Sequence, residues 1–304
     1  MDRIAIIIVH RGNPFYLLPV LKQARLLNPE SRICLLGDSS NDKYDFVEHY
    51  NLRDYSEGIE EFEKMYVHLS PNIFEFERFC FERWLHIRNF IRREGLEFFL
   101  HLDSDDLIFC NVDEVFGKFK GYDFTVCHRI GPCNTLFNKK SIEQFCDIML
   151  SVFQDPHGLD RYRIRRNLND MEVFGWYKEK VSINYLDISI PRDGICFDGS
   201  IYASSGFEME KGKKKIYWID DRPYGKWLES GEKIPFMALH CQGRAKYSVY
   251  KYALDEDKKH RESFYKTLCW IFSKGVVRAR LRSVKIAVKH PDQVVRLIKK
   301  KMHW

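Results

Sequence analysis

Apolar and polar residues alternate in blocks along the first forty residues. Residues 4–9 are all apolar and mostly β-branched, which predicts a central strand buried on both faces. Apolar positions between Tyr16 and Leu27 recur at three- and four-residue spacing, which predicts a helix that ends at Asn28-Pro29. A second strand is predicted at once over residues 32–36, in which an apolar run follows Arg32. A strand, a helix and a strand with short connections predict a parallel sheet, whose ligand sites lie beyond the carboxyl ends of its strands.

The same patterns continue to about residue 250. A strong amphipathic helix is predicted over residues 75–93, and it leads straight into an apolar strand at 98–102. Further expected elements are a short helix at 111–119, a strand at 123–127, a helix at 141–153 and strands at 181–190 and 236–240. Residues 42–73 show no clear pattern, and residues 193–232, rich in Gly, Lys and aromatic residues, are expected to form irregular loops.

Composition limits the possible classes of protein. The chain has 304 residues, of which 45% are hydrophobic and 15% aromatic, values typical of a packed globular protein. Nine cysteines without a C-x-x-C pair do not indicate a disulfide framework, and they favour a reducing compartment. No stretch reaches the roughly 18 apolar residues of a spanning helix, and no secretory signal is recognisable. We therefore expect a cytoplasmic protein, with possible attachment to the cytoplasmic face of a membrane.

The net charge of +6 is concentrated at the C-terminal end. Residues 274–304 hold ten Lys or Arg against Asp292, a net of +9, so the other 273 residues carry −3 (6 minus 9). The body of the protein therefore gives no indication of nucleic-acid binding. Within 256–304, Val277, Leu281 and Val284 share one helical face among basic residues. This pattern fits a helix on an anionic membrane surface, and equally a solvated helix packed on the body.

Two of the predicted strands end in groups that bind metals or phosphates. The strand 98–102 runs into Asp103-Ser104-Asp105, and strand alternation places the two Asp side chains on the same side. Carboxylates held so close repel each other unless a cation neutralises them, and their hard oxygen atoms suit Mg²⁺ or Mn²⁺. An isolated D-x-D is also common as a simple acidic turn. The strand 236–240 ends at His240, followed by Gly243 and Lys246, and lysine is a natural partner for phosphate.

Other nucleotide sites are not indicated. The first strand–helix turn has neither G-x-G-x-x-G nor a Walker lysine, which argues against a dinucleotide-binding Rossmann site and a P-loop. The helix before the D-x-D strand carries several arginines. One of them, Arg83, is a candidate for contacting a diphosphate, although a solvated helix face is the simpler interpretation.

Taken together in this order, the motifs resemble those of a GT-A fold, nucleotide-sugar-dependent glycosyltransferase over about residues 1–255. His240-x-x-Gly243-x-x-Lys246 is similar to the H-x-x-G-x-x-K pattern of the retaining family that includes glycogenin and bacterial lipopolysaccharide galactosyltransferases. The resemblance implies a Rossmann-like α/β fold with a mixed, mainly parallel sheet flanked by helices, followed by a helical C-terminal extension. It also implies that Asp103, Asp105 and His240 bind Mn²⁺ or Mg²⁺, and that Gly243 and Lys246 contact the diphosphate.

The resemblance also suggests roles for residues elsewhere in the chain. Asn134 corresponds to a donor-sugar contact, while Val9, His10 and Asp38 fall where the nucleoside lies. Asp170 resembles an aspartate beside the reacting sugar carbon, although the glutamine that follows it in the family is Met171 here. Asp170 and Glu172 are the candidate catalytic carboxylates, with the role of base unassigned.

The expected function is transfer of a sugar, from a UDP-sugar, to a glycan or lipid-linked acceptor in cell-surface polysaccharide synthesis, with retention of configuration. One alternative is a phosphatase of the haloacid dehalogenase type, which also has a strand followed by Asp-x-Asp. The motif of that family has Thr or Ser two positions after the second Asp, where this chain has Leu107. The other alternative is a non-catalytic, membrane-associated binding module with the same fold.

Overall fold

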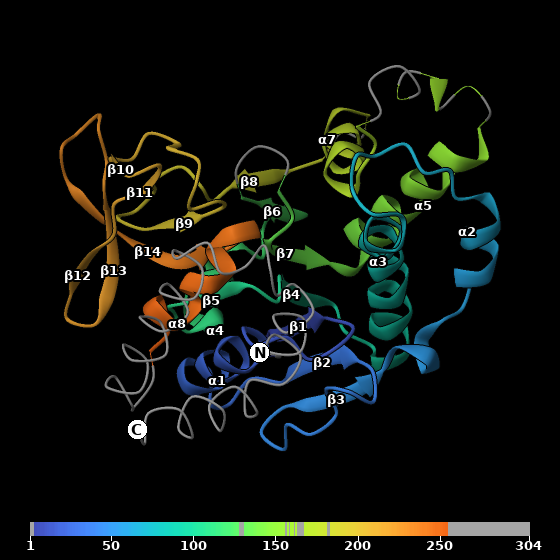
Figure 1. Ribbon diagram of the computed structural model, residues 1–304, viewed down its shortest axis with the longest axis horizontal. Coiled ribbons are helices and arrows are strands. Elements are labelled where there is room, and N and C mark those ends of the chain that lie inside the picture. Colours follow the sequence, from blue (N-terminus) through green and yellow to red (C-terminus); the bar gives the residue numbers. More distant parts are fainter. Residues whose placement is uncertain are drawn as a thin grey trace, which may run out of the picture.

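A computed structural model describes residues 3–127, 131–155, 157, 159–160, 162, 167–180 and 183–254. Its centre is a seven-stranded sheet with the strand order β3-β2-β1-β4-β7-β6-β8 (Figure 1). The strands are β1 (Ala5–Val9), β2 (Ile33–Gly37), β3 (Glu48–Asn51), β4 (Phe98–Leu102), β6 (Phe124–Val126), β7 (Asn134–Asn138) and β8 (Tyr185–Asp187). All neighbours are parallel except the two pairs that involve β7. The prediction of a mixed, mainly parallel sheet is confirmed.

The two faces of this sheet bury two separate cores, as the apolar run in β1 predicts. Ile6 and Ile8 belong to one core, whereas Ile7 and Val9 belong to the other. The first core packs against α1 (Leu17–Leu27), α4 (Val112–Phe116) and a second sheet, and the second core packs against α2 (Ile59–Met65), α3 (Phe74–Glu94), α5 (Lys139–Gln154) and α7 (Asp170–Lys180). Successive side chains of a strand point to opposite faces, so a fully apolar strand needs cover on both.

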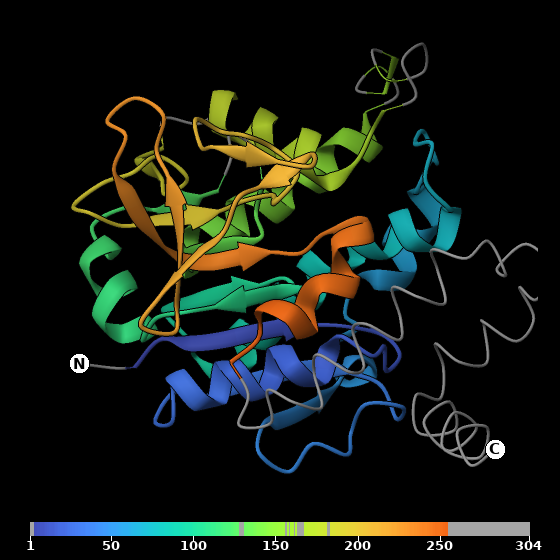
Figure 2. The ribbon, with the colours of Figure 1, turned by 60° about the vertical axis from the view of Figure 1, so that its left-hand side comes forward.

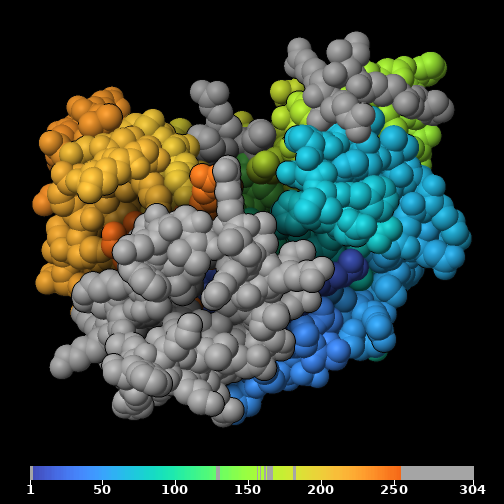
Figure 3. Space-filling view, viewed as in Figure 1, coloured from blue at the N-terminus to red at the C-terminus, as the bar shows by residue number. Residues whose placement is uncertain are grey.

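The second sheet consists of β12 (Tyr217–Ile219), β13 (Arg222–Lys226), β14 (Lys233–His240) and β5 (Asp106–Ile108), with β9 (Cys196–Asp198) also paired to β14. A separate hairpin joins β10 (Met209–Glu210) to β11 (Lys213–Lys214). Figure 2 shows these strands stacked beside the main sheet, and Figure 3 shows β9–β13 and α2–α3 at opposite sides of the molecule. After β14 the chain continues into the 3-10 helix η3 (Gly243–Ser248) and α8 (Val249–Tyr252).

Most of the predicted elements are present, with two corrections. Residues 193–232, expected to be irregular, contain β9 to β13, and residues 42–73, left unassigned, contain β3, α2 and the 3-10 helix η1 (Leu52–Tyr55). In the described part of the strand expected over 181–190, residues 183–190, strand β8 spans Tyr185–Asp187. The basic helix expected within 256–304 lies outside the described residues. Among the described residues, no helix is both long and apolar enough to cross a membrane.

Candidate active site

The candidate site lies where three parallel strands of the main sheet end. β1, β2 and β4 run in the same direction, so His10, Asp38 and Asp103, which directly follow them, occupy one edge of the sheet. This is the edge at which open α/β sheets bind ligands. β14, from the second sheet, brings its last residue, His240, to the same place, because the His240 Nε2 atom lies 3.7 Å from Asp103 Oδ2.

Backbone hydrogen bonds hold the acidic turn in place. The Asp103 amide donates to the Cys133 carbonyl oxygen at 2.9 Å, and the Asp106 amide donates to the Asp103 carbonyl oxygen at 3.0 Å. The Asp105 carbonyl oxygen accepts from the Cys241 amide at 3.0 Å. The turn is therefore tied to both sheets. As predicted from strand alternation, Asp103 and Asp105 face His240, while the Ser104 hydroxyl lies 2.9 Å from the His10 ring.

Asp103, Asp105 and His240 form a group suited to a metal ion. One ligand atom from each lies within 4.8 Å of the others, and His240 Nε2 is 3.5 Å from Asp105 Oδ1. Two atoms that share an ion at about 2.1 Å are separated by about 3–4 Å, so only small shifts are needed. The set of two carboxylates and one imidazole suits Mn²⁺ or Mg²⁺.

The His240 ring is oriented for this role. Its Nδ1 lies 2.8 Å from the Gly199 carbonyl oxygen, so Nδ1 carries the hydrogen and Nε2 faces the carboxylates. The His240 amide donates to Asp198 Oδ2 at 3.2 Å, and Asp198 in turn pairs with Lys214. Without a cation, burial disfavours the imidazolium, but Cys133 and Asp105 raise the pKa of His240 well above its usual value. The protonated ring then neutralises the carboxylates that a metal ion would otherwise hold.

Two further cations contact the same carboxylates. Arg83 bridges Asp103 Oδ1 and Asp170 Oδ2, each at 2.7 Å. Lys246 Nζ lies 3.3 Å from Asp105 Oδ2 and 3.4 Å from the Tyr16 hydroxyl, to which it donates. Burial alone would lower the pKa of Lys246, yet Asp105 raises it, so the amine stays charged. Burial would likewise raise the pKa of Asp103, but Arg83 holds it well below its usual range.

The net charge of the site favours binding of a divalent cation and then of an anion. Asp103, Asp105 and Asp170 carry three negative charges, against the two positive charges of Arg83 and Lys246. A divalent cation in place of the His240 proton would leave a net charge of +1, which attracts a diphosphate. Desolvation and, to a smaller extent, the nearby Lys246 lower the pKa of His10 to about 4, so His10 contributes no charge near neutral pH.

The structure thus brings together most of the residues that the sequence singled out. Val9 is buried at the end of β1, and Asp38 accepts hydrogen bonds from the Gly12 and Ser40 amides at 2.7 and 2.8 Å. Asn134 opens β7 opposite Leu102, and its buried Oδ1 has no hydrogen-bond partner among the residues that the structure describes. Gly243 adopts a φ of +59°, which favours glycine.

Glu172 differs from the other candidates. It is half-buried on α7, and among the described residues no ion pair joins its carboxylate to Arg83 or Lys246, the two cations of the site. Asp170, in contrast, accepts from Arg83 and also from Trp84 Nε1 at 3.0 Å. Of the two candidate catalytic carboxylates, only Asp170 is therefore connected to the metal-binding group.

Several site residues had no signal in the sequence. His101 lies one residue before the end of β4, yet its Nε2 reaches Asp103 Oδ1 at 3.3 Å. Gly199, Asp198 and Lys214, which orient His240, come from the segment expected to be irregular. Their role depends on which loop lies behind β14, and nothing in a local pattern indicates that. For Tyr16 the sequence predicts only a position at the start of a helix, although its hydroxyl and ring contact Lys246.

Comparison with known proteins finds structural similarity only. No protein-family model and no curated protein matches the sequence. Among solved structures, galactosyltransferase LgtC, in complex with donor and acceptor sugar analogues, is 12% identical; the match covers 85% of this chain and all of that one, with a TM-score of 0.48. Mouse xyloside xylosyltransferase 1 is 9% identical, with 62% of this chain and 86% of that one covered and a TM-score of 0.44.

A third similar structure is a glycosyltransferase involved in glycosylation of the major capsid of PBCV-1. It is 12% identical, with 80% of this chain and 96% of that one covered and a TM-score of 0.40. All three are glycosyltransferases, the class that the sequence motifs resemble. With TM-scores below 0.5, these similarities do not by themselves assign an activity to the chain.

Proposed function

We propose that this chain is a metal-dependent glycosyltransferase that uses a nucleoside-diphosphate sugar as its donor. The observation that supports this most is the group of Asp103, Asp105 and His240 at the carboxyl edge of the sheet, with the Lys246 amine 3.3 Å from Asp105. A divalent ion and a lysine side by side match the two charges that a diphosphate leaving group needs. The finer proposal is a UDP-sugar donor, a glycan or lipid-linked acceptor in cell-surface polysaccharide synthesis, and retention of configuration.

Each residue has a part in the proposed reaction. When bound, the metal ion supplies Lewis-acid stabilisation of the leaving diphosphate. Lys246 donates hydrogen bonds to the same phosphates as negative charge develops on them. Arg83 fixes the Asp103 and Asp170 carboxylates relative to each other through its rigid guanidinium fork. We propose that Asp170, held by Arg83 and Trp84, faces the donor sugar rather than acting as a mobile base.

The two alternatives predict different products. A phosphatase of the haloacid dehalogenase type uses its first aspartate as a nucleophile, but here Asp103 Oδ1 is engaged by Arg83 and His101. Such an enzyme would release inorganic phosphate. A binding module without turnover would bind the nucleotide and release nothing. A glycosyltransferase without acceptor would slowly release nucleoside diphosphate and free sugar.

The test is therefore to incubate the protein with Mn²⁺ and a panel of nucleotide sugars and to identify the products. We expect release of nucleoside diphosphate from one donor, dependent on the metal and abolished by Asp105→Ala. Asp54→Ala, at an exposed aspartate of η1 beside Arg93 at the far end of α3, is the matched control and should behave as wild type. If no donor is hydrolysed and no nucleoside diphosphate with metal shifts the melting temperature, the proposal is wrong.

The membrane part of the proposal rests on sequence alone. Residues 256–304 would form a basic amphipathic segment that holds the enzyme on the cytoplasmic face of an anionic membrane, near a lipid-linked acceptor. Flotation with anionic liposomes, with and without residues 274–304, tests it. Equal flotation of the two proteins would contradict it.

A further inference from the structure

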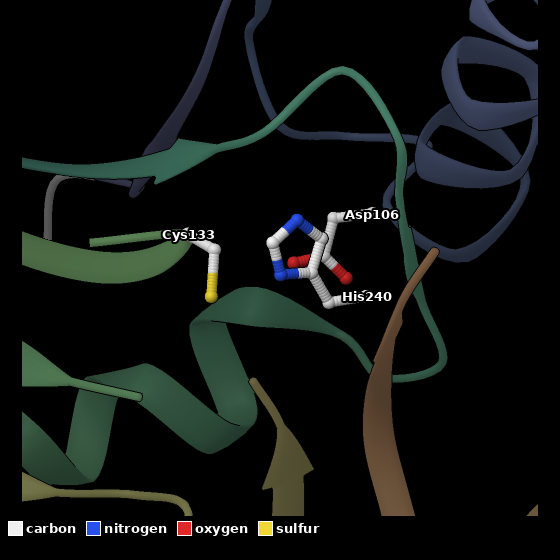
Figure 4. A group of neighbouring side chains, drawn as sticks. All are labelled: Asp106, Cys133 and His240. Atoms are coloured by element: carbon white, nitrogen blue, oxygen red, sulfur yellow. The ribbon is translucent and has the colours of Figure 1, made fainter. Parts of the chain in front are cut away.

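A second group of potential metal ligands lies directly behind the first. Asp106 begins β5, Cys133 precedes β7, and His240 ends β14, where it pairs with Asp106 in the antiparallel register. One ligand atom from each lies within 4.8 Å of the others, and all three residues are buried. Figure 4 shows the three side chains together, with the Cys133 sulfur to one side of the His240 ring and the Asp106 carboxyl group overlapping the ring in this view.

Asp106 lacks the partners that a buried carboxyl group needs. Its side chain is fully buried, with 0% exposure, and neither Oδ1 nor Oδ2 has a hydrogen-bond partner among the described residues. A buried polar group without a partner loses its bonds to water and gains none in return, which destabilises the folded state. The structure keeps this carboxyl group beside an imidazole and a thiol. A bound cation would satisfy the two oxygen atoms that the protein does not.

The donor atoms of this group differ from those of the first. Asp103 and Asp105 offer two hard oxygens, whereas Cys133 brings a soft sulfur. Thiolate, imidazole and carboxylate are the ligands of Zn²⁺, while Mn²⁺ and Mg²⁺ prefer oxygen. Both groups draw on the His240 ring, whose Nδ1 is bonded to the Gly199 carbonyl oxygen and whose Nε2 faces Asp103 and Asp105.

We propose that Asp106, Cys133 and His240 form a zinc-class inhibitory site that excludes the Mn²⁺ or Mg²⁺ site. Binding forms metal bonds to Cys133 Sγ, an Asp106 carboxylate oxygen and a His240 ring nitrogen. It releases to water the protons that these groups carry without the metal ion, namely the thiol proton, the carboxyl proton and one imidazolium proton. The thiolate and the carboxylate balance the charge of the divalent ion, so the buried site becomes neutral. His240 is then unavailable to Asp103 and Asp105, and the proposed activity is lost.

Binding is tested without any nucleotide or sugar, with Co²⁺ as a spectroscopic substitute for Zn²⁺. We expect one equivalent of Co²⁺ to give a sulfur-to-metal charge-transfer band that Zn²⁺ removes. Cys133→Ser should abolish the band, and Asp106→Asn, which keeps the shape of the side chain, should weaken binding at least 10-fold. Cys146→Ser, at a buried cysteine on α5, is the control and should keep the band. A band that persists in Cys133→Ser, or none in the wild type, would overturn the proposal.

A second variant separates this site from the first. Asp103→Asn should keep the thiolate band but lose Mn²⁺-dependent nucleoside-diphosphate binding, whereas Cys133→Ser should do the opposite. If the chain proves not to be a glycosyltransferase, the spectroscopic result is unaffected. Loss of the band in Asp103→Asn with retention in Asp106→Asn would show that Cys133 shares the cobalt ion with Asp103 rather than with Asp106, and would contradict the inference.

Discussion

The buried ion pair behind His240 gives a prediction whose size follows from the structure. Lys214 Nζ lies 2.5 Å from Asp198 Oδ1 and donates to the Ser200 carbonyl oxygen at 2.8 Å. Both side chains are almost fully buried, at 2% and 0% exposure. Removal of one partner of such a pair leaves an uncompensated buried charge, which costs about 3–5 kcal/mol. We therefore predict that Lys214→Met lowers the free energy of unfolding by about that amount.

The neighbouring residue provides the control. Lys215 also forms an ion pair, with Glu208 at 3.1 Å, but that pair is about one third exposed. Pairs in water contribute about 0–1 kcal/mol, so Lys215→Met should cost no more than that. Urea denaturation followed by circular dichroism measures both variants. The double variant Asp198→Asn with Lys214→Met removes both charges and should recover part of the loss, because the two side chains are coupled.

This prediction also concerns the site, because Asp198 accepts the His240 amide and the Gly199 carbonyl oxygen fixes the His240 ring. Lys214→Met should therefore weaken Mn²⁺ binding as well as stability. Lys215→Met should leave Mn²⁺ binding unchanged and cost at most about 1 kcal/mol of stability. If the two lysine variants lose the same free energy of unfolding, the reasoning about the buried pair is refuted.

Three further predictions concern acid sensitivity, backbone conformation and the arginine clamp. Burial lowers the pKa of His86 to about 4, so the unfolded chain binds the proton first as the pH falls. The free energy of unfolding of the wild type should therefore fall by up to about 3 kcal/mol between pH 6.5 and pH 4. His86→Gln should lack this loss, and identical pH profiles of the two proteins in urea denaturation would contradict the prediction. Gly206 has a φ of +84°, and a Cβ there would lie 2.4 Å from the Trp227 ring. Gly212 has a similar φ of +76°, but a Cβ there would meet open space, so Gly206→Ala should cost about 1–3 kcal/mol more stability than Gly212→Ala. Equal melting temperatures of the two variants would argue against the clash. Arg83→Lys keeps the charge but cannot bridge two carboxylates as the guanidinium does. Turnover of the donor should therefore fall at least 10-fold, while Mn²⁺ affinity changes little. Unchanged turnover would contradict the proposed role of Arg83.

The sequence predicts the framework of the fold because its strongest elements have one-dimensional patterns. The apolar run of β1, the periodic helix α3 and the strand before Asp103 each carry their own signal. Buried and half-exposed short strands do not. Asp106–Ile108 was not predicted as a strand, since three residues after an acidic turn have no measurable period, yet β5 pairs with β14 along its length and sets Asp106 opposite His240.

The candidate site was predictable to the same extent. Asp103, Asp105, His240 and Lys246 follow from strand ends and from the family resemblance. The contacts that orient these residues cannot be predicted in this way. Arg83 and Asp170 are 87 positions apart, and Lys214, on the β10–β11 hairpin, pairs with Asp198 on β9. Such contacts depend on how the two sheets and α3 pack, which no local pattern records.

The most direct test of the central claim is calorimetric binding of UDP with and without Mn²⁺ to the wild type and to Asp105→Asn. The claim is that Asp103, Asp105 and His240 hold a divalent ion that in turn binds a nucleoside diphosphate. It predicts that UDP binds to the wild type with Mn²⁺, and that affinity falls at least 10-fold without the metal and in the variant. UDP binding that is equally strong in all of these conditions, or absent from all of them, would contradict it.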